Sequence, residues 1–153
     1  MYTNERPTIP EFPPDEPVYM RYSGLTWEAD GQLANVFRLK YPAEVDKSSF
    51  NRGSLSQPED LLYADDNSYR TKGVLGIIVD EIPKSVSAVG GGTFNFWPAH
   101  VPDDDNYSHS EIWCIREGEP DTLNSPNKPI RTAFRIMLAH SLTEDRICIR
   151  AEK

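Results

Sequence analysis

The sequence is poor in cysteine and has no long apolar run. Its two cysteines, Cys114 and Cys148, lie in short alternating apolar segments, a pattern typical of buried free thiols. A disulfide between them would require an oxidising compartment. The first residues are polar and rich in proline, without the apolar core of a signal peptide, and no segment approaches the length of a membrane span. We therefore expect a cytoplasmic protein.

Basic residues are also few. The chain has 16 lysines and arginines against 24 acids, which gives a formal net charge of −8 at pH 7. Proteins that bind long nucleic acids use lysine and arginine to displace counterions, so this balance argues against a nucleic acid duplex as ligand. A small phosphorylated ligand held by a few local arginines is compatible with it.

Two glycine-dependent motifs of enzymes are missing. Gly90-Gly91-Gly92 lacks the G-x-G-x-x-G spacing of a dinucleotide-binding turn. No G-x-S-x-G segment provides the elbow of a serine hydrolase. The three glycines instead indicate a hinge or a hairpin turn at the end of a flexible loop over residues 83–92.

What the sequence does contain predicts a single α+β domain. With 153 residues, six Phe, seven Tyr and three Trp, the chain has enough bulk to build one hydrophobic core. Residues 1–17 hold five prolines and form an extended N-terminal arm. For residues 18–153 we expect a mostly antiparallel sheet of about six strands with two short helices.

Hydrophobic periodicity places these elements along the chain. Alternating or continuous runs of β-branched and aromatic residues predict strands, and a spacing of three to four residues predicts helices. We expect strands over residues 18–22, 33–39, 74–82, 93–97, 107–116 and 146–151. We expect helices over about 58–64, where Ser56 and Glu59 form a capping box, and over 130–141 after Pro129.

The segment 96–113 is the candidate functional region. It holds two of the three histidines, two of the three tryptophans and the only run of three acids, Asp103 to Asp105. Its proline-bounded polar middle lies between aromatic segments, which is how a chain presents reactive groups on a loop. As a strand, residues 107–116 place Tyr107, His109, Glu111, Trp113 and Ile115 on one face. A helix capped by Ser108 and Glu111 is the alternative, and the β-rich sequence favours the strand.

The residues of this loop suggest acid–base chemistry. On a strand, His109 and Glu111 project together, and a carboxylate beside an imidazole orients it and raises its basicity. With His100 as the second half of an acid–base pair, the set suits metal-independent cleavage of a phosphodiester next to a hydroxyl group. The catalytic candidates are therefore His100, His109 and Glu111. The candidates for ligand binding are Ser49, Asn51, Arg52, Arg70, Lys72, Asn106 and Tyr107. No cofactor or metal ion is expected.

Several alternatives use the same residues. A metal site could combine His100, His109, Glu111 and one of the acids 103–105, although the spacing matches no known signature. The acidic segment could also be an ordinary solvated turn. An ADP-ribose-type enzyme would need Arg21, Ser49 and Glu111 to converge. A non-catalytic acidic binding or inhibitor protein would use the proline-rich arm and exposed aromatic residues.

The segments Ser49–Arg52, Gln57–Tyr63 and Pro102–Ile112 together resemble small uncharacterised proteins of bacteria and their phages, some of which lie in defence loci. Among such proteins, the CRISPR-associated ring nucleases are similar in size. The resemblance implies a cytosolic homodimer in antiviral defence that degrades a cyclic oligoadenylate, because a symmetric cyclic ligand suits a two-fold site. It implies no membrane partner and assigns no individual residue.

Overall fold

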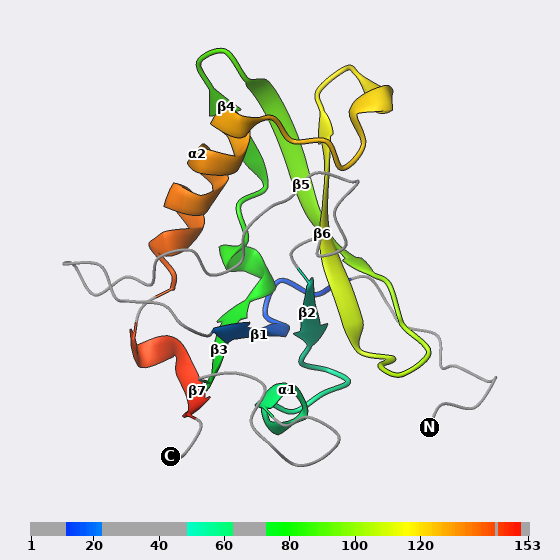
Figure 1. Ribbon diagram of the computed structural model, residues 1–153, viewed down its shortest axis with the longest axis vertical. Helices are drawn as coiled ribbons and strands as arrows, with labels where there is room; N and C mark the ends of the chain where they lie inside the picture. Colours follow the sequence, from blue (N-terminus) through cyan, green and yellow to red (C-terminus); the bar gives the residue numbers. More distant parts are fainter. Residues whose placement is uncertain (1–11, 23–48, 63–72, 143, 151–153) are drawn as a thin grey trace.

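The described residues form a seven-stranded antiparallel sheet with two short helices, consistent with a single α+β domain (Figure 1). The computed structural model describes residues 12–22, 49–62, 73–142 and 144–150. The strands, in the order β4-β5-β6-β2-β1-β3-β7, are β1 Pro17–Tyr22, β2 Ser49–Arg52, β3 Gly73–Ile78, β4 Ser85–Ala88, β5 Gly92–His100, β6 His109–Arg116 and β7 Ile147–Arg150. The helices are α1 Glu59–Leu62 and α2 Lys128–Ala139, with 3₁₀ turns η1 Val79–Glu81, η2 Pro120–Thr122 and η3 Glu144–Arg146.

Most of the predicted elements are confirmed. Strands form where the pattern placed them around residues 18–22, 93–97, 107–116 and 146–151, and β5 continues to His100. The predicted strand 74–82 is confirmed only in its first part, which forms β3. Residues 79–81 form the 3₁₀ turn η1 instead of continuing the strand. Helix α2 begins two residues earlier than predicted, since Asn127 accepts a hydrogen bond from the Ile130 backbone N–H and caps it. The predicted strand 33–39 and residues 1–11 lie outside the described residues.

Two segments without a predicted strand form strands. Ser49–Arg52 forms β2 between β1 and β6. Residues 85–88, predicted as part of a flexible loop, pair with β5 as β4. The expected hairpin turn lies just after β4, where Gly90 and Gly92 have positive φ values of 77° and 73°. In both strands the pairing partners, rather than local propensity, decide the conformation.

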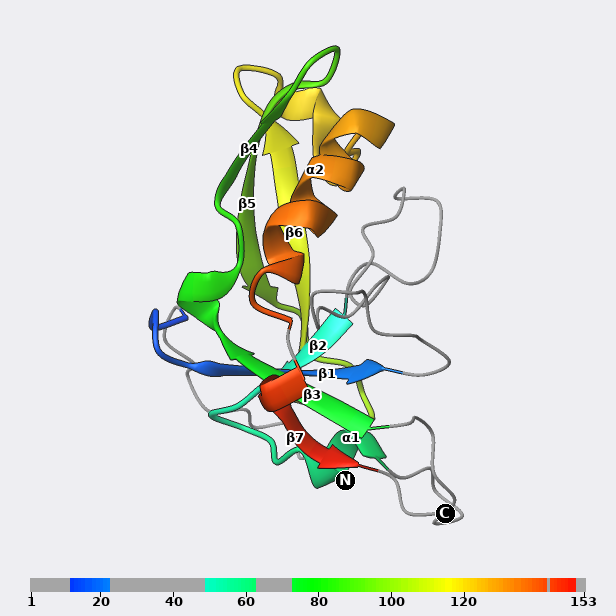
Figure 2. The ribbon, with the colours of Figure 1, turned by 90° about the vertical axis from the view of Figure 1, so that its left-hand side faces the viewer.

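The sheet is covered differently on its two faces. On the first, which we call the α2 face, the main core joins sheet residues such as Phe50, Leu75 and Phe96 to Phe134 of α2. Figure 2 shows α2 lying along one side of β4, β5 and β6. On the second, the α1 face, Leu61 and Leu62 of α1 pack with Val74, Tyr19 and Ile149. Successive residues of each strand therefore alternate between two buried environments.

The start of α1 is capped, although not by the predicted residue. Ser56 and Glu59 were expected to form the capping box, but the Asp60 carboxylate accepts hydrogen bonds from the Gln57 backbone N–H and the Ser56 hydroxyl. The distances are 2.9 Å and 3.1 Å. A carboxylate one residue further along the first turn therefore satisfies the backbone donor.

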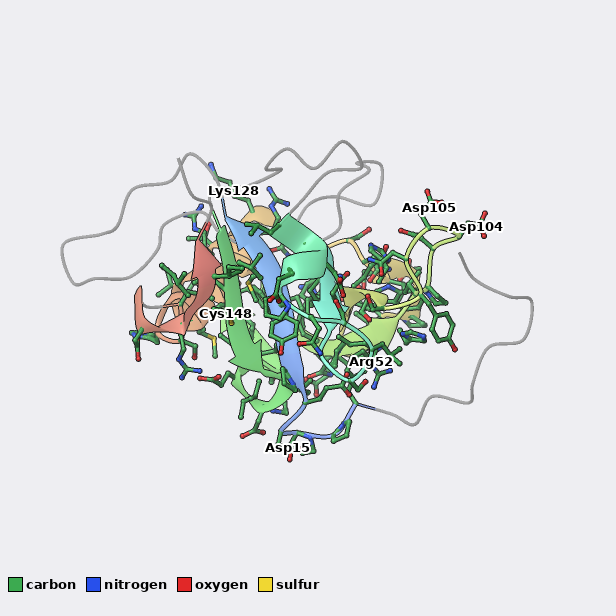
Figure 3. All side chains as sticks on the ribbon, turned by 90° about the horizontal axis from the view of Figure 1, so that it is seen from below. Asp15, Arg52, Asp104, Asp105, Lys128 and Cys148 are labelled. Atoms are coloured by element: carbon green, nitrogen blue, oxygen red, sulfur yellow. The ribbon has the colours of Figure 1, made fainter. Side chains whose placement is uncertain are left out.

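Both cysteines are free. Cys114 is buried as predicted. Burial raises the pKa of its thiol to about 12, although a hydrogen bond with the Asn124 backbone acts in the opposite direction. The prediction that Cys148 is buried is wrong, because it lies exposed on the edge strand β7 (Figure 3). Within the described part of the chain, no helix is long and apolar enough to cross a membrane.

A buried ion pair ties the end of the proline-rich arm to β2. The Glu16 carboxylate accepts hydrogen bonds from Arg52 Nε at 2.7 Å and Nη2 at 2.6 Å, and from Ser54 Oγ at 2.8 Å. Only 1% of the Arg52 side chain and 3% of the Glu16 side chain are exposed. The Phe12 ring covers the guanidinium at 3.8 Å from its centroid. Residues 12–16, which we call the N-terminal strap, are therefore fixed against the sheet.

We expect the fold to be sensitive to removal of either partner of the Glu16–Arg52 pair, because a buried charge would be left uncompensated. Glu16→Gln leaves the buried guanidinium without its carboxylate and should lower the free energy of unfolding by ~3–5 kcal/mol, measured by urea denaturation at pH 7. Asp15→Asn is the matched control, because Asp15 is exposed at the outer edge of the molecule (Figure 3). Equal stability of the Glu16→Gln and Asp15→Asn proteins would contradict this role.

The same pair predicts a pH dependence. Burial raises the pKa of Glu16, but hydrogen bonds from Arg52 and Ser54 outweigh it and hold the pKa below its ordinary value of 4.5. A carboxyl group with a lowered pKa stabilises the fold above its unfolded pKa and loses that contribution as the pH falls through the folded pKa. The difference in stability between the wild type and Glu16→Gln should therefore shrink below pH 4.5.

Candidate active site

The pairing of β2 with β6 brings together several predicted site residues. In the antiparallel register Ser49 lies opposite Glu111, and Asn51 lies opposite His109. Residues directly opposite one another share a face of the sheet. Asn51, His109 and Glu111 therefore lie on the α1 face, and Ser49 occupies the neighbouring register position in the same row as Glu111.

The next strand continues this face of the sheet. β1 pairs with β2 so that Val18 lies opposite Arg52 and Tyr19 lies opposite Asn51. On its other side β1 pairs with β3, where Arg21 lies opposite Val74. The register thus pairs Ser49 with Glu111 directly, but it does not pair Arg21 with Ser49. The convergence of Arg21, Ser49 and Glu111 that the ADP-ribose-type alternative requires stays a prediction.

His109 is held in one tautomer. Its Nδ1 lies 2.7 Å from the backbone carbonyl oxygen of Val101, and a carbonyl only accepts, so Nδ1 carries the proton. A carboxylate oxygen of Asp103 lies 3.7 Å from the same nitrogen. The neutral ring therefore has its lone pair on Nε2, which takes part in no hydrogen bond among the described residues. An imidazole oriented in this way can accept a proton at Nε2.

A network of asparagine hydrogen bonds ties the loop between β5 and β6 to β2. Asn106 Nδ2 donates to Asn51 Oδ1 at 2.7 Å, and Asn51 Nδ2 donates to Ser56 Oγ at 3.1 Å. Asn106 Oδ1 accepts from the Ser108 hydroxyl and backbone N–H. Asn51, only 2% exposed, and Asn106 were predicted to contact a ligand. In the structure they connect β2, the loop and the segment before α1.

The Glu111 carboxylate is positioned by a tryptophan. Trp113 Nε1 donates a hydrogen bond to Glu111 Oε1 at 3.0 Å. Both residues are partly exposed, as expected for the face of β6 that alternates with the buried Ser110 and Ile112. This confirms the predicted division into two faces for residues 109–116, whereas Tyr107 and Ser108 lie in the turn before β6. Trp113 was predicted to share a face with Glu111, and this distance of two positions on a strand was the available signal for the hydrogen bond.

His100 lies on the opposite face of the sheet. It pairs with Ser110, the residue next to His109, so His100 and His109 project to different sides. The His100 ring contacts Tyr107 edge-on, with 5.1 Å between the ring centroids. The structure therefore does not bring the two imidazoles together, and Tyr107 accompanies His100 instead of His109.

The predicted cationic residues are also separated from this row. Arg52 alternates with Asn51, projects to the α2 face and is bonded to the buried Glu16 (Figure 3). The sequence predicted residues 1–17 as an extended arm and gave no signal for the role of the Glu16 carboxylate. Arg70 and Lys72 lie outside the described residues. Within the described residues, no group of three His, Cys, Asp or Glu side chains could hold a metal ion.

We predict that neutral His109 is protonated at Nδ1. A long-range ¹H–¹⁵N correlation spectrum should show a protonated Nδ1 and an unprotonated Nε2 for this residue. Asp103→Asn should leave the tautomer unchanged, because the Val101 carbonyl is the nearer acceptor at 2.7 Å. A protonated Nε2 in the neutral ring would contradict the proposed orientation.

The row of residues on the α1 face and the orientation of His109 are the basis for assigning a function. No protein-family model, curated protein or solved structure matches the chain. The function therefore has to be inferred from the positions and contacts of its own residues.

Proposed function

We propose that the protein is an NAD-dependent enzyme that transfers ADP-ribose to a hydroxyl group or to water. The observation that carries the proposal is the Glu111 carboxylate, which is held by Trp113, lies opposite Ser49 and shares a face of β6 with the oriented His109. In the proposed reaction, the bond between C1′ of the ribose and the pyridinium nitrogen breaks. The electron pair leaves with the ring as neutral nicotinamide, and the acceptor oxygen forms the new bond to C1′ as it loses its proton.

The carboxylate of Glu111 suits the transition state of this reaction. Cleavage of a glycosidic bond passes through an oxocarbenium-like ribose, which a nearby carboxylate stabilises. The hydrogen bond from Trp113 holds one oxygen of Glu111, and the other, Oε2, takes part in no hydrogen bond among the described residues.

His109 and the acidic loop complete the proposed mechanism. Nε2 of His109 is available to accept the proton of the acceptor hydroxyl. Asp103, Asp104 and Asp105 are exposed beside it, and Figure 3 shows Asp104 and Asp105 at the outer edge of their loop. A negative surface attracts the cationic nicotinamide ring, which is the leaving group of the reaction.

Nicotinamide release tests this function. The purified chain is incubated with NAD, and free nicotinamide is measured by chromatography. Glu111→Gln keeps the size of the side chain but removes its charge, and we expect it to slow release by about 10²–10³-fold. His100→Ala, on the opposite face, should have less than about a twofold effect. Absence of release by the wild type, or equal rates for the wild type and Glu111→Gln, would overturn the proposal.

A second candidate function is metal-independent cleavage of a phosphodiester, such as that of a cyclic oligoadenylate. It is favoured by the orientation of His109, whose Nε2 could take a proton from a ribose hydroxyl. With His100 on the other face, this reaction would use one histidine. It would also suit a homodimer, because a symmetric cyclic ligand fits a two-fold axis.

For this reaction we predict that His109→Ala lowers cleavage by about 10²-fold, that His100→Ala has little effect, and that EDTA has none. Cleavage is measured by chromatography of the oligonucleotide products. An equal loss in the two histidine variants would contradict the single-histidine scheme. If the protein consumes neither NAD nor the oligonucleotide, a non-catalytic acidic binding protein becomes the better description.

A further inference from the structure

Two accessible tryptophans lie opposite one another on the α1 face of the sheet. Trp97 of β5 pairs with Trp113 of β6. Their strand neighbours Phe96 and Cys114 belong to the main core, so the two indoles project to the other side of the sheet. Trp97 is 36% exposed, and Trp113 is partly exposed. Aromatic side chains gain most from burial, so a pair that stays accessible on one face marks a surface on which another molecule can bind.

Neither of the described helices covers this part of the sheet. Helix α1 packs against residues of β1, β3 and β7, and α2 lies on the opposite face of β5. In Figure 1, β5 and β6 extend upward beyond α1. Asn95, the neighbour of Trp97 on the same face, is also exposed. The α1 face of β5 and β6 is therefore accessible around the two indoles.

The charge on this face is negative. Its positions on the two strands are Thr93, Asn95, Trp97, Ala99, His109, Glu111, Trp113 and Ile115. They include the Glu111 carboxylate but no lysine or arginine. Trp113 Nε1 holds one oxygen of this carboxylate at 3.0 Å, which keeps the negative charge beside the indoles. Aromatic ring faces and a carboxylate both attract positive charge, so the surface is complementary to a cation.

A small side chain leaves room for a ring at this place. Ala99 lies opposite Glu111 and two residues after Trp97. Positions two apart on a strand are separated by about 6.6 Å, and a stacked ring needs about 3.5 Å. The methyl group of Ala99, which is partly exposed, therefore leaves space for a planar group against the Trp97 indole and next to Glu111.

We propose that Trp97, Trp113 and Glu111 form a binding site for a planar aromatic cation, whose ring stacks on the Trp97 indole over Ala99 with its charge beside Glu111. The identity of the cation rests on the proposed function: it is the pyridinium ring of NAD, held with its bond to C1′ next to the carboxylate. The site then favours the charged ring of the substrate over the neutral nicotinamide that the reaction releases.

The change in charge during the reaction predicts how Trp97 affects turnover. As the bond to C1′ breaks, the electron pair goes to the ring nitrogen and the positive charge moves to the ribose. Contact with the indole is therefore strongest in bound NAD and weaker in the transition state. Trp97→Ala should raise KM for NAD by about 5-fold or more without lowering kcat. A lower kcat with an unchanged KM would contradict this placement of the ring.

Two ligands of the same shape test the site without turnover. 1-Methylnicotinamide carries the pyridinium charge but has no ribose, and nicotinamide is its neutral counterpart. Each is titrated into the full chain and followed by ¹H NMR, in which stacking on an indole moves the ring protons of the ligand upfield. We expect the cation to bind at least about 10-fold more tightly than nicotinamide.

Variants locate the binding. Trp97→Ala should weaken binding of 1-methylnicotinamide at least about 10-fold, and Trp97→Phe should restore part of it, because a phenyl ring offers a smaller aromatic face. Ile136→Ala is the control, since Ile136 is an apolar residue of α2 that is 58% exposed and lies on another element. Circular dichroism identifies any variant that fails to fold, and the comparison of the two ligands in the wild type does not depend on a variant.

Equal affinity for the two ligands, or unchanged binding of 1-methylnicotinamide in Trp97→Ala, would overturn the inference. Preference for the cation without release of nicotinamide from NAD would leave the cation site intact and refute the proposed function. Release of nicotinamide together with equal affinity for the two ligands would refute the cation site and leave the proposed function intact.

Discussion

The pairing of the short strand β2 between β1 and β6 is the constraint on which the rest of the structure depends. β2 has only four residues, so its backbone hydrogen bonds alone hold it weakly. Its side chains provide further stabilising contacts. Phe50 packs in the main core, Asn51 accepts a hydrogen bond from Asn106 in the loop before β6, and Arg52 donates hydrogen bonds to Glu16. These three contacts reach both faces of the sheet. They fix the register that aligns β1, β2 and β6.

Alternation along that register divides the polar residues between two environments. Asn51 and His109 lie on the face covered by α1, whereas Arg52 and His100 lie on the face covered by α2. Residues that are neighbours in the sequence therefore serve different surfaces. One face has acids with an oriented imidazole and suits a reaction. The other has the main core and the buried Glu16–Arg52 pair and stabilises the fold.

Much of the fold could be predicted from the sequence, because residues 107–116 and Ile130 to Leu138 have clear periodicity. The two faces of β6 followed from its alternation alone. β2 could not be predicted, since Ser49 to Arg52 has one apolar residue and becomes a strand only through its neighbours. Without β2, the sequence placed His100 and His109 together on the basis of a shared loop. The role of Glu16 was hidden for the same reason, because its partner lies 36 residues away.

The loop between His100 and His109 has a consequence for how this protein can change. A strand residue exchanges faces whenever the connection before it gains or loses one position while the pairing slips to match. A single-residue insertion there could carry the imidazole and the carboxylate of β6 into the main core and expose the apolar side chains. A slip of two residues leaves every side chain of β6 on its original face of the sheet. The faces of β6 are therefore preserved only where a change in the length of this loop leaves the register of β6 with β5 unchanged.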